Sequence, residues 1–387
     1  MKKIICILIS IIISLSFTGC RGSKQEVEKL AVVMAIGFDL TPENKYLVTV
    51  QILNAQKESS KGDQGSSSPQ VMIFSSEGYT PYDAISNLST KYGRDLYFGH
   101  SQYIVIGKHL AESGLSLFID SALRSHQTRA GDILLLAKDK ASEVVAFKPI
   151  DETIPSNSVK NLTKLQSFKG YSPIISRLDF ANALYSKTSS PIMGVIDINQ
   201  SSNISPTLKL DGTGVFRKDK LIGHLNIKET RGMQWIKGKV KNGTITTSLP
   251  NGKKITFYIL GATSKVKSII ENNNIIIKVN IKSQSSILEL DDKLDTMKHP
   301  KIMDDLGKLQ SEAIEREVNL ALNASQKKFD ADIFDFGSLI HRDYPKEWKS
   351  LEGNWNNIFP HIKVEVTVTS NLKNPGTISK SIDSSIK

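Results

Sequence analysis

Both cysteines of this 387-residue chain lie within its first 20 residues, and this placement limits how the rest of the chain can be stabilised. Cys6 lies inside an apolar leader and Cys20 lies directly after it. If the leader is removed, Cys20 is the only thiol left, so neither a disulfide nor a cysteine pair for a metal can form within the chain. The remaining residues must therefore fold on hydrophobic cores alone, and they are numerous enough for two or three domains.

The leader has the pattern of a secretory signal peptide. Two lysines precede an apolar stretch over residues 4–17, and the small residues Thr18 and Gly19 follow it. This combination defines such a signal, whereas a membrane-spanning helix needs about 20 apolar residues. We therefore predict a signal peptide over residues 1–19.

The end of the leader predicts a lipid anchor. Phe17, Thr18, Gly19 and Cys20 resemble the lipobox of bacterial lipoproteins, in which the cysteine is acylated and the chain is cut just before it. Phe17 stands where leucine is usual in that motif. Two or more acyl chains hold a protein stably on a membrane, at about 0.8 kcal/mol per buried methylene. We expect Cys20 to carry this lipid; the alternative is a plain secreted protein with an accidental cysteine.

The formal net charge of +11 does not point to nucleic acid. The basic residues are scattered, with lysines alternating over 237–241 and paired at 253–254 and 327–328. Nucleic-acid binding calls for a basic stripe with stacking aromatic residues, which the sequence does not show. We expect no nucleic-acid partner, while a modest positive excess suits a protein that faces anionic lipid headgroups.

Apolar patterning predicts strands and capped helices in the first half of the chain. Alternating or continuous apolar runs predict strands over 30–39, 46–53, 71–77, 101–107 and 132–137. Thr80 with Asp83, and Ser176 with Asp179, have the spacing of capping boxes. We therefore expect helices over 80–93 and 175–187, with an amphipathic stretch over 110–123 between them.

The second half predicts a hairpin, a meander and a long helix. A polar, turn-rich segment over 198–206 marks the main domain boundary. Beyond it the pattern predicts a hairpin over 208–225, a short helix over 229–238, strands over 244–249, 254–260, 264–270, 275–282 and 361–370, and a helix over 302–328. On the long helix we expect one buried stripe of Ile302, Leu306, Leu309 and Ala313.

These elements predict an α+β fold of successive domains, in which mixed or antiparallel sheets are packed with helices after the lipoprotein signal peptide. We place the signal peptide at residues 1–19, an N-terminal domain at 20–200 and a C-terminal domain, with the β-meander and the long helix, at 201–387.

A search for catalytic and metal-binding patterns finds none in the sequence. The histidines lack zinc-protease spacing, and neither a phosphate-binding glycine loop nor a nucleophile elbow occurs. Residues 330–337 superficially resemble a calcium loop. Phe334 and Asp335, however, occupy the places of the fifth-position ligand and the sixth-position glycine. We therefore expect no catalytic residue, no metal and no cofactor.

Several stretches together resemble the spore germination lipoproteins of the Ger(x)C family, the C subunits of germinant receptors. The resemblance covers the chain after the leader in the family's order, through LAVVMAIGFDL, YLVTVQIL, YFGHSQYIVIGKHLAESGL, LDGTGVFRKDKLIGHLN, ETRGMQWIKGKV and QKKFDADIFDFGSLIHRDYPKEW. The family often carries Trp-Asp directly after the cysteine and then Arg-Glu. Here Arg21-Gly22 and Gln25-Glu26 stand in these places, which puts a role for this short stretch in doubt.

The resemblance implies a non-enzymatic receptor component. Such C subunits work beside an A subunit and a polytopic B subunit, lipid-anchored on the outer face of the inner spore membrane, and respond to nutrient germinants. The alternative is a lipid-anchored solute-binding protein for a transporter, which calls for two α/β lobes around a cleft. A cell-envelope hydrolase is a weaker alternative. We expect Phe334, Phe336, Trp348 and Trp355 to pack in a core instead of binding a ligand.

Overall fold

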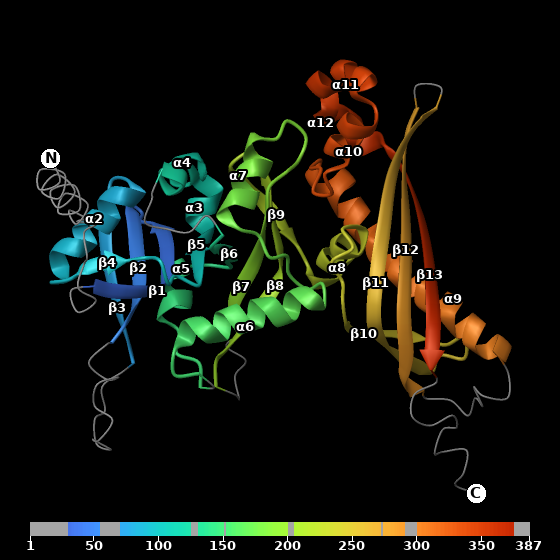
Figure 1. Cartoon of the computed structure of the whole chain (residues 1–387), viewed down its shortest axis with the longest axis horizontal. Coiled ribbons are helices and arrows are strands. Elements are labelled where there is room, and N and C mark those ends of the chain that lie inside the picture. Colours follow the sequence, from blue (N-terminus) through green and yellow to red (C-terminus); the bar gives the residue numbers. More distant parts are fainter. Residues whose placement is uncertain are drawn as a thin grey trace, which may run out of the picture.

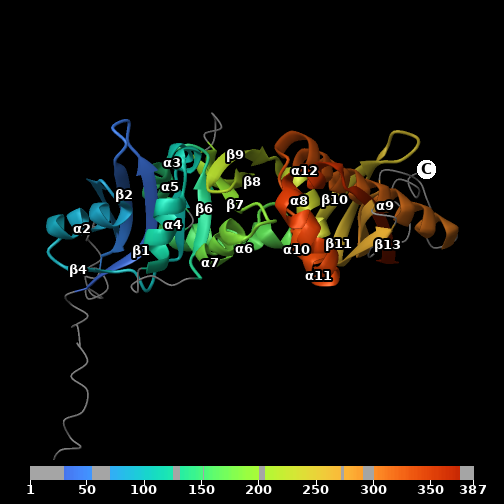
Figure 2. The same ribbon diagram turned by 90° about the horizontal axis from the view of Figure 1, so that it is seen from above.

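A computed structural model describes residues 30–54, 70–124, 131–150, 152–199, 205–271, 274–290 and 300–374. In this part of the chain, a nine-stranded sheet and a four-stranded sheet lie side by side along an elongated molecule (Figures 1 and 2). Helix α8 (Ile227–Ile236) lies between them. The predicted α+β fold class is confirmed.

The first sheet is mixed. Its strands are β1 (Leu30–Leu40), β2 (Tyr46–Leu53), β3 (Val71–Gly78), β4 (Asp95–Tyr97), β5 (Tyr103–Ile106), β6 (Ile133–Ala137), β7 (Ile192–Asn199), β8 (Thr207–Arg217) and β9 (Lys220–Leu225). Their order is β3-β2-β1-β5-β6-β7-β8-β9, and β4 pairs with β1. The pairs from β1 through β7 are parallel, and the hairpins at both edges are antiparallel.

Helices cover both faces of this sheet. They are α2 (Pro81–Lys91), α3 (Lys108–Ser113), α4 (Ser116–Arg124), α5 (Ala141–Ala146), α6 (Pro155–Phe168) and α7 (Arg177–Tyr185). One core contains Leu88, Phe118 and Phe180 from α2, α4 and α7. A second core contains Val145 of α5 and Val159 of α6 and lies against the other face. Burial on both faces explains why the central strands read as continuous apolar runs.

The predicted helix starts are confirmed. The Thr80 hydroxyl accepts a hydrogen bond from the Asp83 amide at 3.1 Å, and Ser176 forms a complete capping box with Asp179. The amphipathic stretch over 110–123 is two helices, however, because Gly114 with φ 126° ends α3 before α4 begins. Helices α5 and α6 and strand β7 were not predicted.

The second sheet is built from β10 (Gly243–Ser248), β11 (Lys254–Glu271), β12 (Asn274–Leu290) and β13 (Lys363–Asn374). Between the last two strands lie α9 (Pro300–Asn323), a π-helical turn (Ala324–Phe329), α10 (Phe336–Asp343), α11 (Pro345–Leu351), a 3-10 turn (Glu352–Asn354), α12 (Trp355–Ile358) and a second 3-10 turn (Phe359–His361). The strands expected over 254–260 and 264–270 are one strand, β11, with a bulge between Ile259 and Gly261. The meander ends at β12, because β13 pairs with it in parallel.

The hairpin of β8 and β9 belongs to the first sheet. We placed it at the start of the C-terminal domain, but β8 pairs with β7 from Ile192–Val215 to Asn199–Thr207. The first sheet thus ends at Leu225, which lies beyond the polar segment over 198–206 where we expected the boundary. The division into domains at 20–200 and 201–387 stays a prediction.

The stripe predicted on the long helix faces the second sheet. Leu306 and Ala313 are buried, and Ile302 and Leu309 are partly buried. Leu306 packs in a core with Ile255 and Phe257 of β11 and other apolar side chains. The stripe therefore attaches α9 to the sheet, as a helix with one apolar face is expected to do.

Leu306→Asp should unfold the chain far more easily than a matched change on the exposed side of α9. Leu306 is 5% exposed, so the new carboxylate would enter an apolar core at a cost of several kcal/mol, roughly 3 or more. Leu320→Asp is the control, because Leu320 is 43% exposed on the same helix. Urea unfolding measures both variants, and equal losses of stability would show that α9 does not pack through this stripe.

Candidate functional site

Helix α8 connects the two sheets and carries the residues from which the candidate site is built. It starts in a capping box, in which Asn226 Oδ1 accepts hydrogen bonds from the Lys228 and Glu229 amides and Glu229 Oε2 accepts one from the Asn226 amide. Every residue from Thr230 to Ile236 is buried. A Cβ at Gly232 would overlap the carbonyl of Glu317 on α9. The two helices therefore approach closely because this position is glycine.

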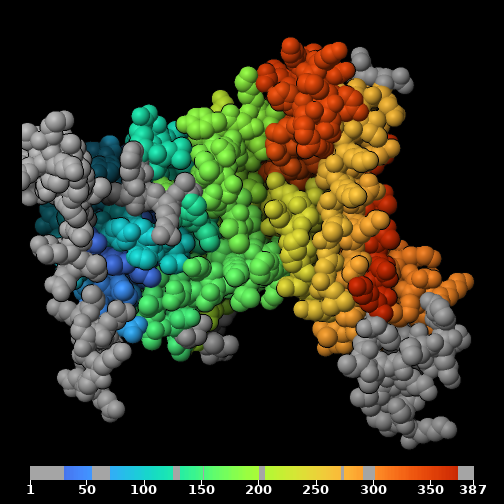
Figure 3. All heavy atoms as spheres, viewed as in Figure 1, coloured from blue at the N-terminus to red at the C-terminus, as the bar shows by residue number. Residues whose placement is uncertain are grey.

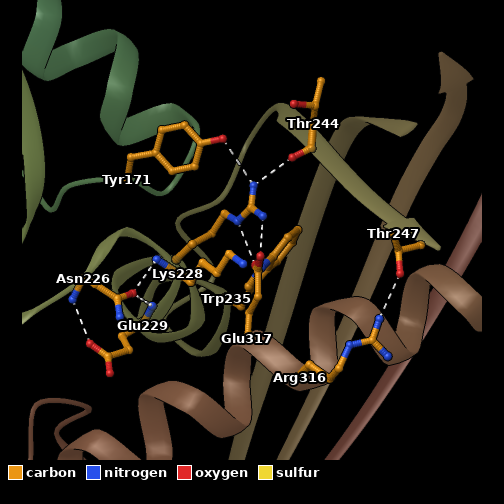
Figure 4. A network of polar contacts seen from close by, with 10 residues as sticks. Tyr171, Asn226, Lys228, Glu229, Trp235, Thr244, Thr247, Arg316 and Glu317 are labelled. Atoms are coloured by element: carbon orange, nitrogen blue, oxygen red, sulfur yellow. Dashed lines mark hydrogen bonds and ion pairs between the residues drawn. The ribbon is translucent and has the colours of Figure 1, made fainter. Parts of the chain in front are cut away.

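A buried ion pair joins α8 to α9 (Figure 4). Arg231 donates from Nε to Glu317 Oε2 at 2.7 Å and from Nη2 to Glu317 Oε1, and Trp235 Nε1 donates to Glu317 Oε2 at 3.0 Å. Arg231 Nη1 also donates to the Thr244 carbonyl at 2.8 Å and to the Tyr171 hydroxyl at 3.4 Å. One guanidinium thus links two helices, strand β10 and the segment after α6.

Glu317→Met should destabilise the chain by about 3–5 kcal/mol, because it leaves the buried Arg231 charge without its carboxylate. The double variant Arg231→Met/Glu317→Met should recover much of this loss, since it removes both charges at once. Urea unfolding of the two variants checks this. If the double variant loses at least as much stability as the single one, the guanidinium is not compensated mainly by Glu317.

A cavity of about 740 Å³ lies where α7, the end of α8 and the start of α10 meet. Its polar lining includes Lys237, Lys239, Lys241, Asp179 and Asp335, and its apolar lining includes Phe168, Ile174, Ile175, Ile192 and Ile333. The walls come from both halves of the molecule, which meet between the green and orange-red parts of Figure 3.

Short polar contacts hold the two walls of the cavity together. The Ser190 amide donates to the Asp332 carbonyl at 2.9 Å, and the hydroxyls of Thr188 and Ser338 lie 3.1 Å apart. Lys187 Nζ donates to Glu352 Oε2 at 3.2 Å. The loop between α7 and β7 is therefore attached to the helical segment of the second half.

A buried carboxylate shapes the wall before α10. Asp332 is 3% exposed, and it accepts hydrogen bonds from the amides of Phe334 at 3.2 Å, Phe336 at 3.1 Å and Gly337 at 2.9 Å. Burial raises the pKa of Asp332 to about 6, against the opposing effect of the bonds from Gly337 and Phe336. The turn that leads into α10 is thus organised around one carboxylate.

Two charged residues lie in the cavity wall beside this turn. Lys237 caps the C-terminal end of α8 and is half-buried. Burial lowers the pKa of its ammonium, while Asp335 and Asp332 act in the opposite direction. Asp335 has the left-handed backbone conformation, with φ 69°, and its Oδ1 is buried without a hydrogen-bond partner among the described residues. The Lys237 ammonium and the Asp335 carboxylate can therefore still bind a polar or charged group of another molecule.

Stability should fall as the pH rises from about 4 to about 6 because of Asp332. Its carboxyl titrates near 3.8 when unfolded and near 6 when folded, so the folded chain holds an extra proton between these values. The free energy of unfolding should therefore drop by up to about 3 kcal/mol across this interval. Lys237 and Asp335 are the charged groups that face this carboxyl.

Urea unfolding against pH for the wild type and Asp332→Asn measures this effect, since the variant lacks the titrating group. Asp330→Asn is the control, because Asp330 is exposed in the same segment. Parallel stability profiles for the wild type and Asp332→Asn would contradict the assignment. Carbon-13 NMR titration of the Asp332 carboxyl reads the same pKa directly.

The residues we singled out from the sequence fall into three groups: the lipobox, the calcium-like segment at 330–337, and four aromatic residues. Phe17, Thr18, Gly19 and Cys20 lie outside the described residues. The carboxylates of the calcium-like segment diverge, since Asp332 binds backbone amides and Asp335 lies at the cavity. Across the described ranges, no group of three or more metal-ligating side chains comes together.

The predicted aromatic packing is confirmed. Phe334, Phe336, Trp348 and Trp355 are each at most 7% exposed and belong to one core. Phe334 and Phe336 stack with centroids 5.0 Å apart, and Trp348 meets Trp355 edge-on at 5.2 Å. No helix among the residues that the structure describes is long and apolar enough to cross a membrane.

Sequence reasoning missed Lys237 and Asp335 as residues of one site. The alternating lysines behind a predicted helix were visible, and so was the acidic segment nearly 100 residues later. Nothing in the pattern showed that these two stretches face each other. Their proximity depends on how α8 packs between the two sheets.

These features define an α+β protein of two sheets, joined by a buried ion pair and hollowed by a charged cavity at the junction. Residues 23–198 match the family model "Spore germination protein N-terminal domain", and residues 211–376 match "Spore germination B3/ GerAC like, C-terminal". The chain belongs to the Ger(x)C family of spore germination proteins. The resemblance seen in the sequence is thereby confirmed.

Individual relatives match over nearly their full length. Spore germination protein B3 of Bacillus subtilis (strain 168) is 24% identical over 371 residues, 95% of this chain and 96% of the relative. Spore germination protein KC of the same organism is 26% identical over 393 residues, 96% and 95% of the two chains. A crystal structure of the GerBC protein covers 88% of this chain and 97% of its own, with 20% identity and a TM-score of 0.56, which shows the shared fold.

Proposed function

We propose that this chain is a lipid-anchored, non-enzymatic subunit of a nutrient germinant receptor and acts in spore germination. The observation that carries the proposal is the succession of two germination-protein family models over residues 23–198 and 211–376. Relatives that match from end to end are named spore germination proteins. A shared role in germination is the simplest reason for similarity over the whole chain.

The sequence of the leader supports the anchor. Cys20 directly follows Phe17, Thr18 and Gly19, and we propose that it is acylated after cleavage of residues 1–19. Two or more acyl chains hold a protein stably on a bilayer. The domains at 20–200 and 201–387 would then lie on the outer face of the inner spore membrane.

The anchor supports a need for partners. A lipid in one leaflet does not carry a conformational signal across a bilayer, so the proposed subunit acts with membrane-spanning proteins, the A and B subunits of the receptor. The rival function, solute capture for a transporter, calls for two α/β lobes of alternating strands and helices. The second sheet, with three successive antiparallel strands, fits this less well.

Cys20→Ala should prevent attachment of the lipid and impair germination. A deletion strain that lacks other receptor copies, complemented with the wild type or with this variant, allows both measurements on the same spores. We expect the variant to remain as uncleaved precursor or in the soluble fraction, to lose labelling by a palmitate analogue, and to reduce the response to at least one nutrient.

The two readouts separate the parts of the proposal. Ser16→Ala is the control, because it changes a small residue of the leader and keeps the thiol. A Cys20→Ala protein that still labels with palmitate would refute the anchor. A deletion strain that germinates normally with every nutrient tested would refute the role in germination.

A further inference from the structure

The junction cavity carries more positive charge than free negative charge. Lys237, Lys239 and Lys241 line it, against the carboxylates of Asp179 and Asp335. Asp179 Oδ2 already accepts hydrogen bonds from the Ser176 amide at 2.9 Å and the Ser176 hydroxyl at 2.6 Å. The cavity therefore favours an anionic group, because three lysines outnumber the two carboxylates in its lining, although Lys241 Nζ already donates to the Gly238 carbonyl at 3.2 Å.

Two groups of opposite charge in the wall lack direct partners. Among the described residues, no carboxylate lies within ion-pair distance of the Lys237 ammonium, although Asp335 and Asp332 act on it through space. Asp335 Oδ1 is likewise buried without a hydrogen bond. Leaving such groups unpaired costs free energy, and a ligand that bonds to both removes this cost.

The rest of the wall is suited to an apolar body of modest size. Phe168, Ile174, Ile175 and Ile333 line the cavity beside the charged groups. Its volume of about 740 Å³ lies in the range of small-molecule sites, roughly 300–1,000 Å³. Ile174 is 45% exposed, which leaves apolar surface for a ligand to cover.

We propose that this cavity binds a small organic acid that has an apolar body and a hydrogen-bond donor next to its carboxylate. The carboxylate pairs with Lys237, the donor bonds to the Asp335 carboxylate, and the apolar body covers Ile174 and Phe168. The donor can be a hydroxyl or an ammonium group, since both satisfy the same acceptor. The inference goes beyond the proposed function, which assigns no ligand to this subunit.

Such a ligand would also stabilise the junction. One wall consists of residues between 167 and 192, in the half of the chain that forms the first sheet. The other wall contains Lys237 and Asp335, from the segments around α8 and α10. A molecule that contacts both walls binds the closed arrangement better than an open one. Binding therefore raises the melting temperature, and the rise grows with the logarithm of the ligand concentration above the Kd.

Four probes that share the same branched 3-methylbutyl chain test the proposal on the full-length wild-type chain in detergent micelles. They are 2-hydroxy-4-methylpentanoate, leucine, 4-methylpentanoate and isoamylamine, which carry in turn a carboxylate with a hydroxyl, a carboxylate with an ammonium, a carboxylate alone and an ammonium alone. Isothermal titration calorimetry should show that the hydroxy acid or leucine binds about tenfold more tightly than 4-methylpentanoate, the value of one hydrogen bond to a charged group. Isoamylamine should not bind.

Variants of the chain assign the contacts. Lys237→Met keeps the length of the side chain and should abolish binding of all three acids. Asp335→Gly suits the left-handed backbone at φ 69° and should remove the tenfold advantage of the donor-bearing acids. Lys228→Met is the control, because Lys228 is an exposed lysine at the other end of α8 and should leave binding unchanged.

The comparison among probes on the wild-type chain decides the result even if a variant fails to fold. Preference for leucine over the hydroxy acid would identify the donor as an ammonium, and the reverse would identify it as a hydroxyl. Equal affinity for 4-methylpentanoate, binding of isoamylamine, or no binding at about 10 mM of any acid would overturn the proposal. None of these results bears on Cys20 or on the germination phenotype, so the two proposals fail independently.

Discussion

The buried pair of Arg231 and Glu317 is the interaction on which the junction of the two sheets depends. Two charges removed from water need each other and further hydrogen bonds, and here Trp235, Thr244 and Tyr171 supply them. Trp235 donates to the carboxylate, and Tyr171 and Thr244 accept from the guanidinium, so satisfying this pair positions α9, β10 and the segment after α6 against α8. Gly232 lets α9 come close enough for the pair to form.

The same packing creates the cavity. Because α8 is held against α9, the residue that caps its C-terminal end, Lys237, lies opposite the turn at 330–337. Asp332 holds that turn by accepting hydrogen bonds from three backbone amides, and Asp335 then lies in the cavity wall. The site thus combines a rigid frame of satisfied buried polar groups with two charged groups that are not satisfied. In a family of spore germination proteins, a site that spans both halves of the chain offers a place where a small molecule can change how the halves fit together.

Local sequence signals predicted those elements that are stabilised locally. Residues close in the chain define two helix caps, at Thr80 and Ser176, and both are confirmed. Local apolar patterning likewise predicted the strands over 46–53 and 71–77, which are also confirmed. Helix α5 was missed because 6 residues are too few to show a helical period, and α6 was missed because its 14 residues are mostly polar, even on the buried face with Ser156, Thr163 and Ser167. The expected break in β11 was wrong because a bulge bends a strand without ending its pairing.

The sequence by itself determined the α+β class, the family, and the need to fold without disulfides, since these follow from patterning, from long stretches of similarity and from two cysteines at one end. Tertiary structure alone decided that β8 and β9 extend the first sheet, that β13 runs parallel to β12, and that Lys237 faces Asp335. The physical reason is that strand partners and cavity walls are contacts between residues far apart in the chain. Their geometry depends on how whole faces pack, which local periodicity does not record.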